Sequence, residues 1–537
     1  MSRSLLSRPL QQALSDGLLS DTDVFDYGCG RGDDVRTLSA LGLEAHGWDP
    51  AHSPGSPRRA AGLVNLGYVV NVIEDPLERV DVLKSAWELA GSVLVVSARL
   101  TWEMDGSRTR PFGDGVLTSA DTFQKFFTHE ELKAWVESIL GRPAVTAAPG
   151  VLYVFRKQSD AQQLLARITR RSSVPRRGFA ELLVEQHREA MEPLREFVSS
   201  SRRLPRADEL ETAQDLIEVF GSLRSAFLVL RHASGAHFWA DVDLGAKRRS
   251  KLRFDEHIED LQPLMDFVAE RGRTPRPGEL ANEATLNQKF GSVRAAFSLV
   301  RKVTGPSPWE EYELHAKTNF MIYSALAAFS GRPKFSELPD DLQHDAKDLF
   351  GSYRNACQAS DQLLHQIADM DAIDQACQEA PFGKLTGEAL YVHVDYLNQL
   401  PALLRVYEGA ARHITGNVDD ATLVKLNRIK PQVSFLVYPT FEVDPHPALE
   451  ASIVAKLGEI RMKHRFFGNS SNPPILHRKE AFVPETHPTW AKFRRLTDQE
   501  ERASLLDRPD IGTRHGWDAL LEAAGYSLRG HRLVKAS

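Results

Sequence analysis

The sequence is poor in cysteine, has no long apolar run and carries little net charge for its length. Only three of its 537 residues are cysteines, and their scattered positions (Cys29, Cys357 and Cys377) exclude a disulfide framework and a cysteine-ligated zinc site. No apolar run approaches the roughly 18 residues of a membrane-spanning helix, and the first residues lack the apolar core of a secretion signal. We therefore expect a cytoplasmic protein with no membrane partner.

The charge balance excludes a uniformly basic nucleic-acid-binding protein. The chain has 66 Lys and Arg residues against 72 Asp and Glu residues, so its net charge is -6 and any nucleic-acid surface must be local. Hydrophobic residues make up 42% and charged residues 26% of the chain, which is ordinary for globular proteins. The length predicts about three or four domains.

A glycine-rich loop follows the first apolar segment. A short apolar strand leads into Asp26, and Gly28, Gly30 and Gly32 follow at alternate positions before a helical pattern begins. Glycines allow a sharp turn and a close approach to a ligand, and a helix N-terminus presents free N–H groups. About 20 residues further on, a second strand ends at Asp49, where an acid can bind both hydroxyls of a ribose. This pattern predicts the nucleotide-binding end of a Rossmann-like α/β domain.

Two cofactors fit such a loop. A dinucleotide needs a further glycine three positions beyond Gly30, where this chain has Asp33, whose charge would repel a pyrophosphate. S-adenosylmethionine carries no phosphate, and Asp26 can help to hold the ammonium of its methionine end. The spacing Asp-x-Gly-x-Gly-x-Gly resembles motif I of class I methyltransferases. We predict S-adenosyl-L-methionine as the cofactor, with a dehydrogenase and a turn without ligand as alternatives. The predicted cofactor-binding residues are Asp26, Gly28, Gly30, Gly32 and Asp49.

The segments after Asp49 continue the alternation of strands and helices. We expect a strand, a helix, a strand, a helix capped by Thr128 and a closing hairpin, in that order, over residues 62–70, 77–90, 92–100, 128–140 and 144–155. The stretch between Asp49 and Gly62 has little room for the usual third strand and helix. The predicted domain is therefore trimmed and ends near Lys157.

The sequence says less about the mechanism than about the cofactor. Methylation at cytosine C5 needs a cysteine nucleophile, typically after proline, whereas the three cysteines here follow Tyr, Ala and Ala. The remaining mechanism is positioning of the acceptor's nucleophile in line with the sulfonium methyl group. The polar residues nearest the predicted methyl site are Asn65, Tyr68 and Asn71, which we predict as catalytic residues, and no general base is assigned.

The middle of the chain repeats with an offset of 70 residues. Residues 193–198, 204–206 and 220–227 match residues 263–268, 274–276 and 290–297, and a weaker third copy includes Phe350-Gly351-Ser352. We predict an array of small helical modules, each with a Pro turn and a Phe-Gly-Ser helix start. The three units cover about residues 187–235, 257–305 and 318–365.

The repeats resemble the homing-endonuclease-associated repeat, a helical module linked to DNA binding. The serine of each Phe-Gly-Ser can cap a helix, which places an arginine in the first turn, where a helix N-terminus can meet a phosphate. A scaffold or protein-binding array is the alternative, because acids balance bases across the units. The predicted DNA-binding residues are Arg224, Lys247, Arg248, Arg249, Arg294 and Arg354.

The last third of the chain carries no standard catalytic motif. His393, His446 and His477 could bind a metal, but polar loop histidines are the more frequent case, so we predict no metal. Residues 472–480, Asn-Pro-Pro-Ile-Leu-His-Arg-Lys-Glu, could form a stiff cationic loop that recognises an anionic substrate, or a surface turn. The methyltransferase Asn-Pro-Pro-aromatic loop is expected after the fourth strand rather than here.

Taken together, the two ends of the chain resemble the family of methyltransferases associated with DNA phosphorothioation. The resemblance rests on residues 26–34, 47–50, 71–76, 389–393, 405–409 and 473–480. It implies methyl transfer in a bacterial DNA-modification and defence context, with DNA and other DNA-modification proteins as partners. We predict an α/β Rossmann-like class I methyltransferase domain, then an all-α repeat region, then an α+β C-terminal domain. Their expected bounds are 1–157, 158–375 and 376–537.

Overall fold

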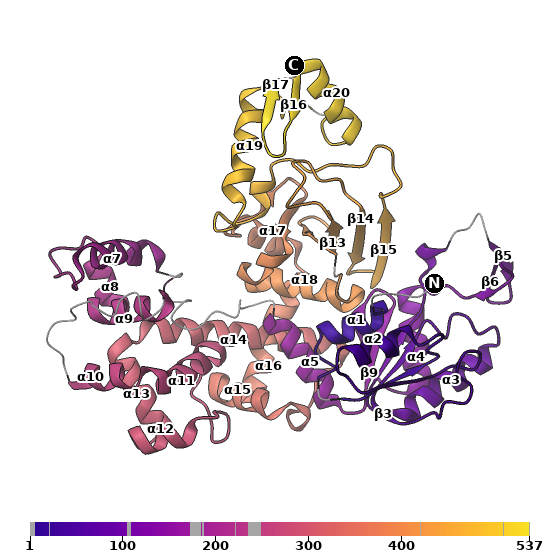
Figure 1. The fold of residues 1–537 in the computed structure, drawn as a ribbon, viewed down its shortest axis with the longest axis horizontal. Coiled ribbons are helices and arrows are strands. Elements are labelled where there is room, and N and C mark those ends of the chain that lie inside the picture. Colours follow the sequence, from indigo (N-terminus) through magenta and orange to yellow (C-terminus); the bar gives the residue numbers. More distant parts are fainter. Residues whose placement is uncertain are drawn as a thin grey trace. The chain divides into compact units, whose positions relative to one another are not determined.

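The computed structural model divides the chain into two compact units. The structure describes residues 6–20, 22–104, 109–171, 184, 187–220, 222–234, 249–418, 420–508 and 510–535 (Figure 1). The first unit, here called the sheet unit, comprises Met1–Ile168, Ala325–Glu337 and Asp361–Ser537. The second, the repeat unit, comprises Thr169–Ser324 and Leu338–Ser360. Three segments expected in the repeat region, 158–168, 325–337 and 361–375, thus belong to the sheet unit.

The N-terminal sheet has a mixed, Rossmann-like topology. Its strand order is β2-β1-β3-β4-β9-β8, with β2, β1, β3 and β4 parallel and the β9–β8 hairpin antiparallel. The strands are β1 (Val24–Tyr27), β2 (Ala45–Trp48), β3 (Ala61–Gly67), β4 (Ala90–Ser97), β8 (Ala144–Ala148) and β9 (Val151–Phe155). The predicted trimming is confirmed, because only turns and an extended segment connect β2 to β3 and β2 lies at the edge of the sheet.

Helices cover both faces of this sheet because its strands are apolar on both sides. Phe25 and Val64 belong to the core on one face, whereas Val24 and Leu63 belong to the core on the other. The helices are α1 (Arg8–Ser15), α2 (Asp33–Ala40), α3 (Pro76–Leu89), α4 (His129–Leu140) and α5 (Gln158–Arg171). The predicted start of α4 is confirmed: the Thr128 hydroxyl accepts from Glu131 N at 3.1 Å in a capping box.

A small antiparallel sheet that was not expected from the sequence is inserted between β4 and α4. It follows the short 3-10 helix η1 (Thr101–Glu103) and has the strand order β5-β6-β7. Its strands are β5 (Thr109–Phe112), β6 (Gly115–Thr118) and β7 (Phe123–Gln124). Asp114, in its first turn, accepts a hydrogen bond from the buried guanidinium of Arg79 at 2.8 Å, which ties the insertion to α3.

The repeat unit is helical, and its first two modules share equivalent ring contacts. His187 packs edge-on against Phe220 at 5.4 Å between ring centroids, and His257 packs edge-on against Phe290, 70 residues later, at 5.4 Å. Its helices include α7 (Arg188–Ser201), α8 (Ala213–Phe220), α9 (Leu223–Ser234), α10 (Arg249–Glu256), α11 (Ile258–Arg271), α12 (Glu283–Phe290) and α13 (Val293–Thr304). Then follow α14 (Ser307–Ala327), η4 (Ala328–Ser330), η5 (Phe335–Glu337), α15 (Asp340–Phe350) and α16 (Tyr353–Gln366), some of which cross into the sheet unit.

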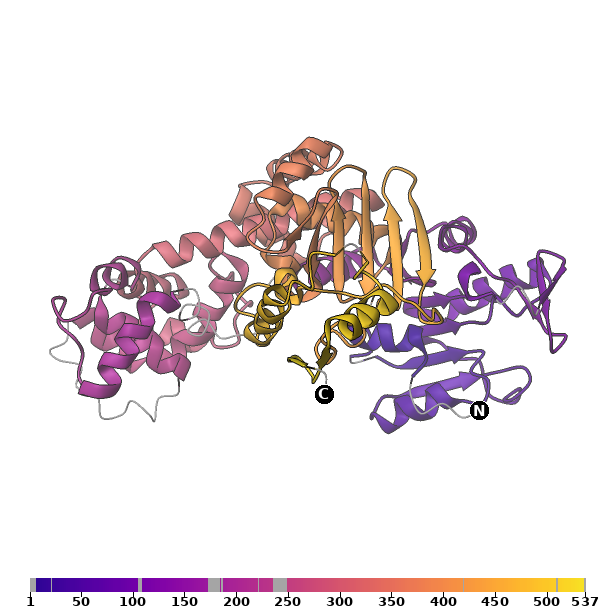
Figure 2. The same cartoon turned by 90° about the horizontal axis from the view of Figure 1, so that it is seen from above.

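The C-terminal part of the sheet unit is an α+β fold. Its antiparallel sheet has the order β10-β11-β12-β13-β14-β15, with β15 at one edge (Figure 2). The strands are β10 (Lys384–Leu385), β11 (Ala389–His393), β12 (Leu423–Asn427), β13 (Gln432–Val437), β14 (Ala451–Lys456) and β15 (Arg461–Phe466). The helices are α17 (Met370–Gln378), η6 (Val394–Gln399), α18 (Ala402–Thr415), η7 (Lys479–Phe482), α19 (Trp490–Arg502) and α20 (Arg514–Ala524), followed by the hairpin of β16 (Tyr526–Leu528) and β17 (Leu533–Lys535).

The two sheets of the sheet unit are joined by direct contacts. The backbone N–H of Asn417, just after α18, donates to the carbonyl of Ala147 in β8 at 2.7 Å. The backbone N–H of Met462 in β15 donates to Glu130 Oε1 in α4 at 2.8 Å. Within the described ranges, no helix has both the length and the apolar character that crossing a membrane requires.

Candidate functional site

The glycine loop lies at the carboxyl end of β1, between that strand and α2. Gly28, Gly30 and Gly32 all have left-handed backbones, with φ of 85°, 52° and 73°. At Gly28 a Cβ atom would lie 2.4 Å from Val69 Cγ2, so no larger residue fits without a shift. The N–H of Gly28 donates to the carbonyl of Trp48 at 2.8 Å, which holds the loop against the end of β2. The loop conformation therefore requires glycine, as the sequence pattern indicates.

Gly30 and Asp49 meet at the open side of this loop. The N–H of Gly30 donates to Asp49 Oδ2 at 3.0 Å. The other carboxylate oxygen, Oδ1, accepts from Ala51 N at 2.9 Å and His52 N at 2.8 Å. Burial raises the pKa of Asp49, but these hydrogen bonds outweigh it and hold the pKa below its ordinary value, so the carboxyl is ionised at neutral pH. A Cβ atom on Gly30 would meet no heavy atom within 4 Å, so the loop has free space on that side.

Asp26 lies deeper, at the end of β1, and pairs with Asn65 of β3. Its side chain is buried, and its Oδ1 accepts from Asn65 Nδ2 at 2.8 Å. Burial raises the pKa of Asp26 to about 7, the Asn65 hydrogen bond opposes this, and the charges of Asp34 and Asp49 add to it. Among the described residues, Asn65 Oδ1 has no hydrogen-bond partner although it is buried. The pair thus offers two buried acceptors where a cationic group could bind.

The three predicted catalytic residues differ in their surroundings. Asn65 is buried beside Asp26, and Asn71 is buried with its Nδ2 donating to Gln124 Oε1 at 2.9 Å. In the structure Asn65 orients Asp26 and Asn71 holds β7, and contact of either side chain with a methyl acceptor stays a prediction. Tyr68 is half-buried and has φ of 59°, a strained backbone for a residue other than glycine. Such strain at the carboxyl end of a strand is typical of functional sites.

Cys29 lies inside the glycine loop but is a poor nucleophile. Burial, with the charges of Asp26 and Asp49, raises the pKa of its thiol to about 11. The thiolate is the reactive form of cysteine, so Cys29 stays in its unreactive form at neutral pH. Its close packing against Gly47, where a Cβ atom would lie 2.7 Å from Cys29 Cβ, gives it a structural role.

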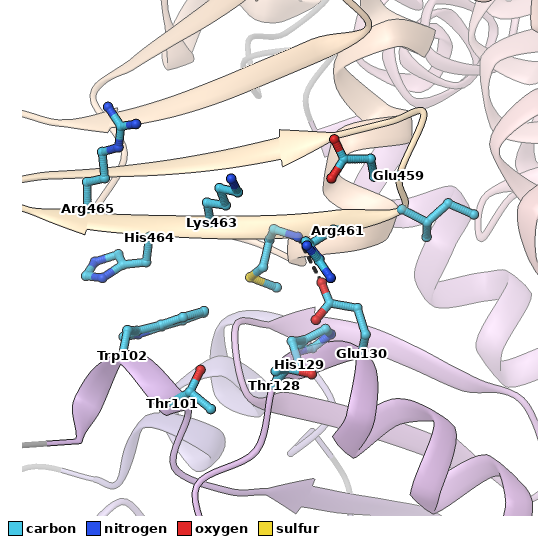
Figure 3. A pocket seen from close by; sticks show the side chains of 12 residues that line it. Thr101, Trp102, Thr128, His129, Glu130, Glu459, Arg461, Lys463, His464 and Arg465 are labelled. Carbon is cyan, nitrogen blue, oxygen red and sulfur yellow. Dashed lines mark hydrogen bonds between the residues drawn. The ribbon is translucent and has the colours of Figure 1, made fainter. Parts of the chain in front are cut away.

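A pocket of about 630 Å³ lies between the residues that follow β4 and the edge strand β15 (Figure 3). From the first sheet it is lined by Thr101, Trp102 and the start of α4. From the second it is lined by β15 and the turn before it, residues 459–465. The indole of Trp102 lies 5.1 Å from the His464 ring, measured between centroids. The pocket is thus next to the carboxyl edge of the parallel strands, where open α/β sheets bind their ligands.

Three cations of β15 line this pocket: Arg461, Lys463 and Arg465. They alternate along the strand, so they share one of its faces, and Figure 3 shows Lys463 and Arg465 on the side of β15 opposite to His464 and Trp102. Arg461 and Arg465 are exposed, and Lys463 is exposed as well. None of the three forms an ion pair with another described residue. This group is not among the residues predicted from the sequence, although the alternation Arg-Met-Lys-His-Arg indicates a strand with one basic face. An arrangement of this kind favours an anionic ligand.

The predicted DNA-binding residues separate into three groups. Arg294 and Arg354 lie in the first turns of α13 and α16, behind Ser292 and Ser352, whose hydroxyls accept from Ala295 N and Asn355 N. Arg224 is buried, 6% exposed, and its guanidinium pairs with Asp255 at 3.3 Å. The prediction that Arg224 contacts phosphate is therefore wrong, because α10 covers it. Lys247, Arg248 and the side chain of Arg249 lie outside the described residues.

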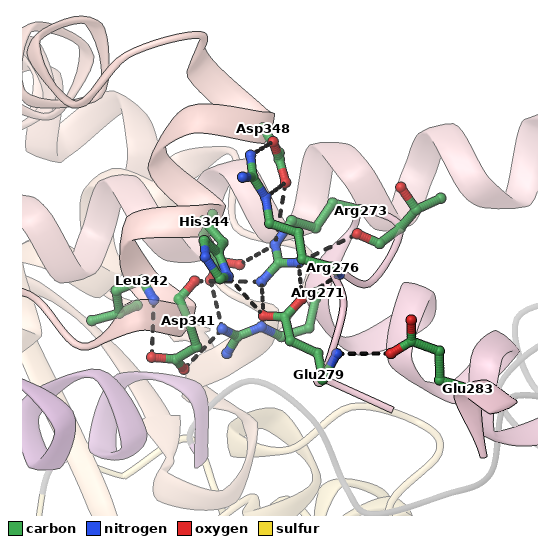
Figure 4. A network of polar contacts seen from close by, with 12 residues as sticks. Arg271, Arg273, Arg276, Glu279, Glu283, Asp341, Leu342, His344 and Asp348 are labelled. Atoms are coloured by element: carbon green, nitrogen blue, oxygen red, sulfur yellow. Dashed lines mark hydrogen bonds and ion pairs between the residues drawn. The ribbon is translucent and has the colours of Figure 1, made fainter. Parts of the chain in front are cut away.

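Other arginines of the repeats hold modules together (Figure 4). Arg273, 3% exposed at its side chain, pairs with Glu279 at 2.7 Å and with Asp345 of α15 at 2.7 Å. Arg276 pairs with Asp348 of the same helix at 2.6 Å. The equivalent Arg203 of the first module pairs with Glu209 at 2.7 Å, but at the surface. Part of the basic character of the repeats is therefore structural, as expected if the repeats form a scaffold.

The segment 472–480 is not a cationic surface loop. His477 is 8% exposed and Lys479 is 2% exposed, and Lys479 Nζ donates to the Asp444 carbonyl at 2.7 Å. Arg478 pairs with Glu501 of α19. The Asn472 side chain accepts from His515 N at 2.8 Å, at the start of α20. The prediction that this segment recognises an anionic substrate is therefore corrected. Its basic side chains bond to other residues of the C-terminal fold.

Comparison with solved structures gives partial likenesses to methyltransferases. No family model and no curated protein matches the chain. The 1,6-didemethyltoxoflavin-N1-methyltransferase of Burkholderia thailandensis, solved with 1,6-didemethyltoxoflavin and S-adenosylhomocysteine, is similar at 15% identity over 28% of this chain and 79% of its own, with a TM-score of 0.21. The CcbJ methyltransferase from Streptomyces caelestis is similar at 14% identity over 27% and 87%, with a TM-score of 0.21. Because these likenesses are weak, the function proposed below rests on the residues themselves, and the resemblance to the phosphorothioation-associated family stays a prediction.

Proposed function

We propose that the chain is an S-adenosylmethionine-dependent methyltransferase that acts on an anionic acceptor, with DNA as the first choice. The observation that carries the proposal is the contact between Gly30 and Asp49 at the carboxyl edge of a parallel sheet. It places a glycine backbone that a ligand can approach, open space and an ionised carboxylate together, as an adenosyl cofactor requires.

The residues present fit this cofactor group by group. The open side of Gly30, where a Cβ atom would have no neighbour, leaves room for the ligand to approach the backbone. Asp49, ionised at neutral pH, suits the ribose hydroxyls as a hydrogen-bond acceptor. The buried carboxylate of Asp26 and the unpartnered Asn65 Oδ1 suit the ammonium of the methionine end. When bound, the cofactor supplies an electrophilic methyl group on its sulfonium.

The chain's own contribution is placement rather than covalent catalysis. The raised pKa of Cys29 argues against a thiolate nucleophile in the loop. Tyr68, half-buried with a strained backbone at the end of β3, is the residue we assign to contact the acceptor. Holding the acceptor nucleophile in line with the methyl group accounts for much of the acceleration in reactions of this kind.

The acceptor is proposed to be anionic because of the basic face of β15, the strand that borders the pocket beside β4. Its basic face, formed by Arg461, Lys463 and Arg465, has no ion-pair partners among the described residues. Arg294 and Arg354, at helix starts in the repeat unit, suit phosphates, which supports DNA as partner. A DNA-modification context and partners from such a system follow from the family resemblance, which stays part of this proposal.

Two measurements on the full chain test the proposal. Calorimetry with S-adenosylhomocysteine tests the cofactor site, and transfer of a labelled methyl group to DNA, tRNA and protein extracts tests the acceptor. We expect cofactor binding and label in the DNA fraction. Binding without transfer to any fraction would favour a non-catalytic DNA-binding accessory, and label in small molecules or protein would reassign the acceptor. No binding of the cofactor product would contradict the proposal itself.

The basic pocket has its own matched test. Replacing Arg461, Lys463 and Arg465 together with alanine should raise KM for the acceptor and leave cofactor affinity unchanged. Lys430→Ala, which removes an exposed cation from the β12–β13 turn of the same sheet, is the control. If the triple variant and the control methylate alike, the basic face of β15 does not bind the acceptor.

A further inference from the structure

The C-terminal fold contains a buried group of metal-ligating side chains that the proposed methyl transfer does not use. It consists of His446, His477 and Glu500 of α19, and one ligand atom from each lies within 4.8 Å of the others. All three are buried: 1%, 8% and 0% exposed. They come from three separate segments, so no short sequence motif indicates the group.

Hydrogen bonds to backbone carbonyls determine which nitrogen of each histidine is free. A carbonyl only accepts, so the ring nitrogen facing it must carry the proton, and in a neutral imidazole the other nitrogen is a bare acceptor. His477 Nε2 donates to the Ile511 carbonyl at 2.8 Å, which leaves Nδ1 bare. His446 Nδ1 donates to the Leu476 carbonyl at 3.1 Å, which leaves Nε2 for the interior of the group. Metal-ligating histidines are typically held in this way.

The group is incomplete without a further atom. Within the part of the chain that the structure describes, His477 Nδ1 and Glu500 Oε2 have no hydrogen-bond partner. Because His477 Nε2 donates to the Ile511 carbonyl, the neutral ring has only a lone pair at Nδ1 and cannot donate from it. Two buried acceptors in one group are unfavourable unless a cation or a hydrogen-bond donor lies beside them.

The alternative is an ion pair without metal. His446 Nε2 lies 2.7 Å from Glu500 Oε1, and an imidazolium there would satisfy that contact. It would not supply a partner to His477 Nδ1 or to Glu500 Oε2. The indole of Trp517 in α20 packs against both imidazoles, with centroids 4.6 Å apart in each case. The ion pair therefore explains one contact of the group, whereas a cation explains all three ligands.

We propose that His446, His477 and Glu500 bind one divalent transition-metal ion, with Zn²⁺ as the best match. Two imidazoles and one carboxylate form a donor set that suits Zn²⁺. Metal–ligand bonds of about 2.0–2.2 Å would draw the three atoms closer together than they lie here. The site would join the 444–447 and 472–480 segments to α19, so its role is to stabilise the C-terminal fold.

Metal analysis of the untagged full chain, with matched variants, tests this site. We expect about one metal ion per chain in the wild type, as for a structural site, and a loss of at least about tenfold in His477→Gln and Glu500→Gln. The control is His393→Gln, which alters another buried histidine of the same fold, 7% exposed, and should keep the metal. Removal by a chelator should lower the melting temperature of the wild type and the control, and Zn²⁺ should restore it.

If the variants fail to fold, X-ray absorption spectroscopy on the wild type still tests the proposal. With Zn²⁺ or Co²⁺ bound, the ligand shell should contain imidazole nitrogen and oxygen and no sulfur. A wild-type protein that is purified without metal, and whose melting temperature neither Zn²⁺ nor Co²⁺ changes, would overturn the proposal. So would bound metal whose shell contains no imidazole, or metal that both variants retain.

Discussion

The backbone N–H of Gly30 donates to Asp49 Oδ2 across a distance of 3.0 Å, and this contact joins the glycine loop to the end of β2. The two residues are 19 positions apart in the sequence but adjacent at the carboxyl edge of the sheet. Because the parallel pairing of β1 and β2 sets this distance, the loop and the acid act as one binding element.

The first prediction concerns the loop. Gly30→Val places a branched side chain in the space where no heavy atom lies within 4 Å, so it should abolish binding of S-adenosylhomocysteine in calorimetry. Gly113→Val is the matched control, since Gly113 has a similar φ of 56°, also has no neighbour within 4 Å, and lies in the β5–β6 turn. Both carry the same backbone strain. Equal affinities in the two variants would place the cofactor elsewhere.

The second prediction concerns the acid. Asp49→Ala should weaken cofactor binding by about 1.5–3 kcal/mol, the range for a hydrogen bond to a charged group. Asp75→Ala, which removes the N-cap of α3 and its bond to Leu77 N, is a control for the loss of an aspartate that accepts backbone bonds. It should lower the melting temperature without changing cofactor affinity. An Asp49 variant that binds like the wild type would exclude contact with the ribose.

The third prediction is a pH dependence that arises from Asp26. Because its pKa is raised to about 7, the carboxyl must lose a proton before it can pair with an ammonium group. Affinity for S-adenosylhomocysteine should therefore rise with pH up to about 7 and level off above it, by at most about tenfold per pH unit. Asp26→Asn should flatten the profile. Asp23→Asn, at the other end of β1, should keep it.

The same group affects stability in the unliganded protein. The folded state keeps the Asp26 proton up to about pH 7, whereas the unfolded chain loses it near the ordinary pKa of 3.8. The folded state thus binds more protons between these values, so the free energy of unfolding should fall as pH rises through this window. Denaturation by urea at several pH values measures this slope, and Asp26→Asn should reduce it. An unchanged slope would show that Asp26 has an ordinary pKa.

The sequence was sufficient to predict elements whose signals are local. The apolar periods of β1, β3, α3 and β4, the cap at Thr128 and the glycine spacing all act within a few residues, and the structure has each of them. The 70-residue offset likewise predicted equivalent contacts, such as those of His187 and His257. The three short strands after β4 were missed because their residues, two to four per strand, show no clear alternation.

The parts that could not be predicted depend on contacts distant in sequence. Arg224 and Arg294 occupy the same position of the repeat, yet Arg224 is buried and pairs with Asp255, whereas Arg294 is exposed. Nothing near Arg224 in the sequence indicates this difference. The sequence around His477 likewise indicates a cation in a loop. The residues that surround it in the fold, Ile511 and Glu500, lie on later segments.

The fourth prediction compares two equivalent ion pairs of the repeats. Glu279→Ala leaves Arg273, whose side chain is 3% exposed, without one of its three acidic partners, and should cost about 3–5 kcal/mol of stability, as for a broken buried pair. Glu209→Ala removes the same contact from Arg203, whose side chain is 46% exposed, and should have little effect. Thermal or urea denaturation of the two variants measures the difference. Equal losses would contradict the assignment of Arg273 as the buried member.

The fifth prediction concerns DNA. If Arg294 and Arg354 bind phosphates at the starts of α13 and α16, replacing both with alanine should weaken DNA binding. The slope of log affinity against log salt should also become shallower by about 0.9 for each phosphate of duplex DNA that is no longer neutralised. Fluorescence anisotropy with a labelled duplex at several salt concentrations measures both quantities.

Lys302→Ala is the control for this test, because it removes an exposed cation from the last turn of α13, where a helix end disfavours anions. It should leave the salt slope near that of the wild type. A weaker affinity with an unchanged slope in the double variant would mean that its effect is not electrostatic. DNA binding that neither variant changes would remove these helix starts from the interface, and the basic face of β15 would then be the next surface to vary.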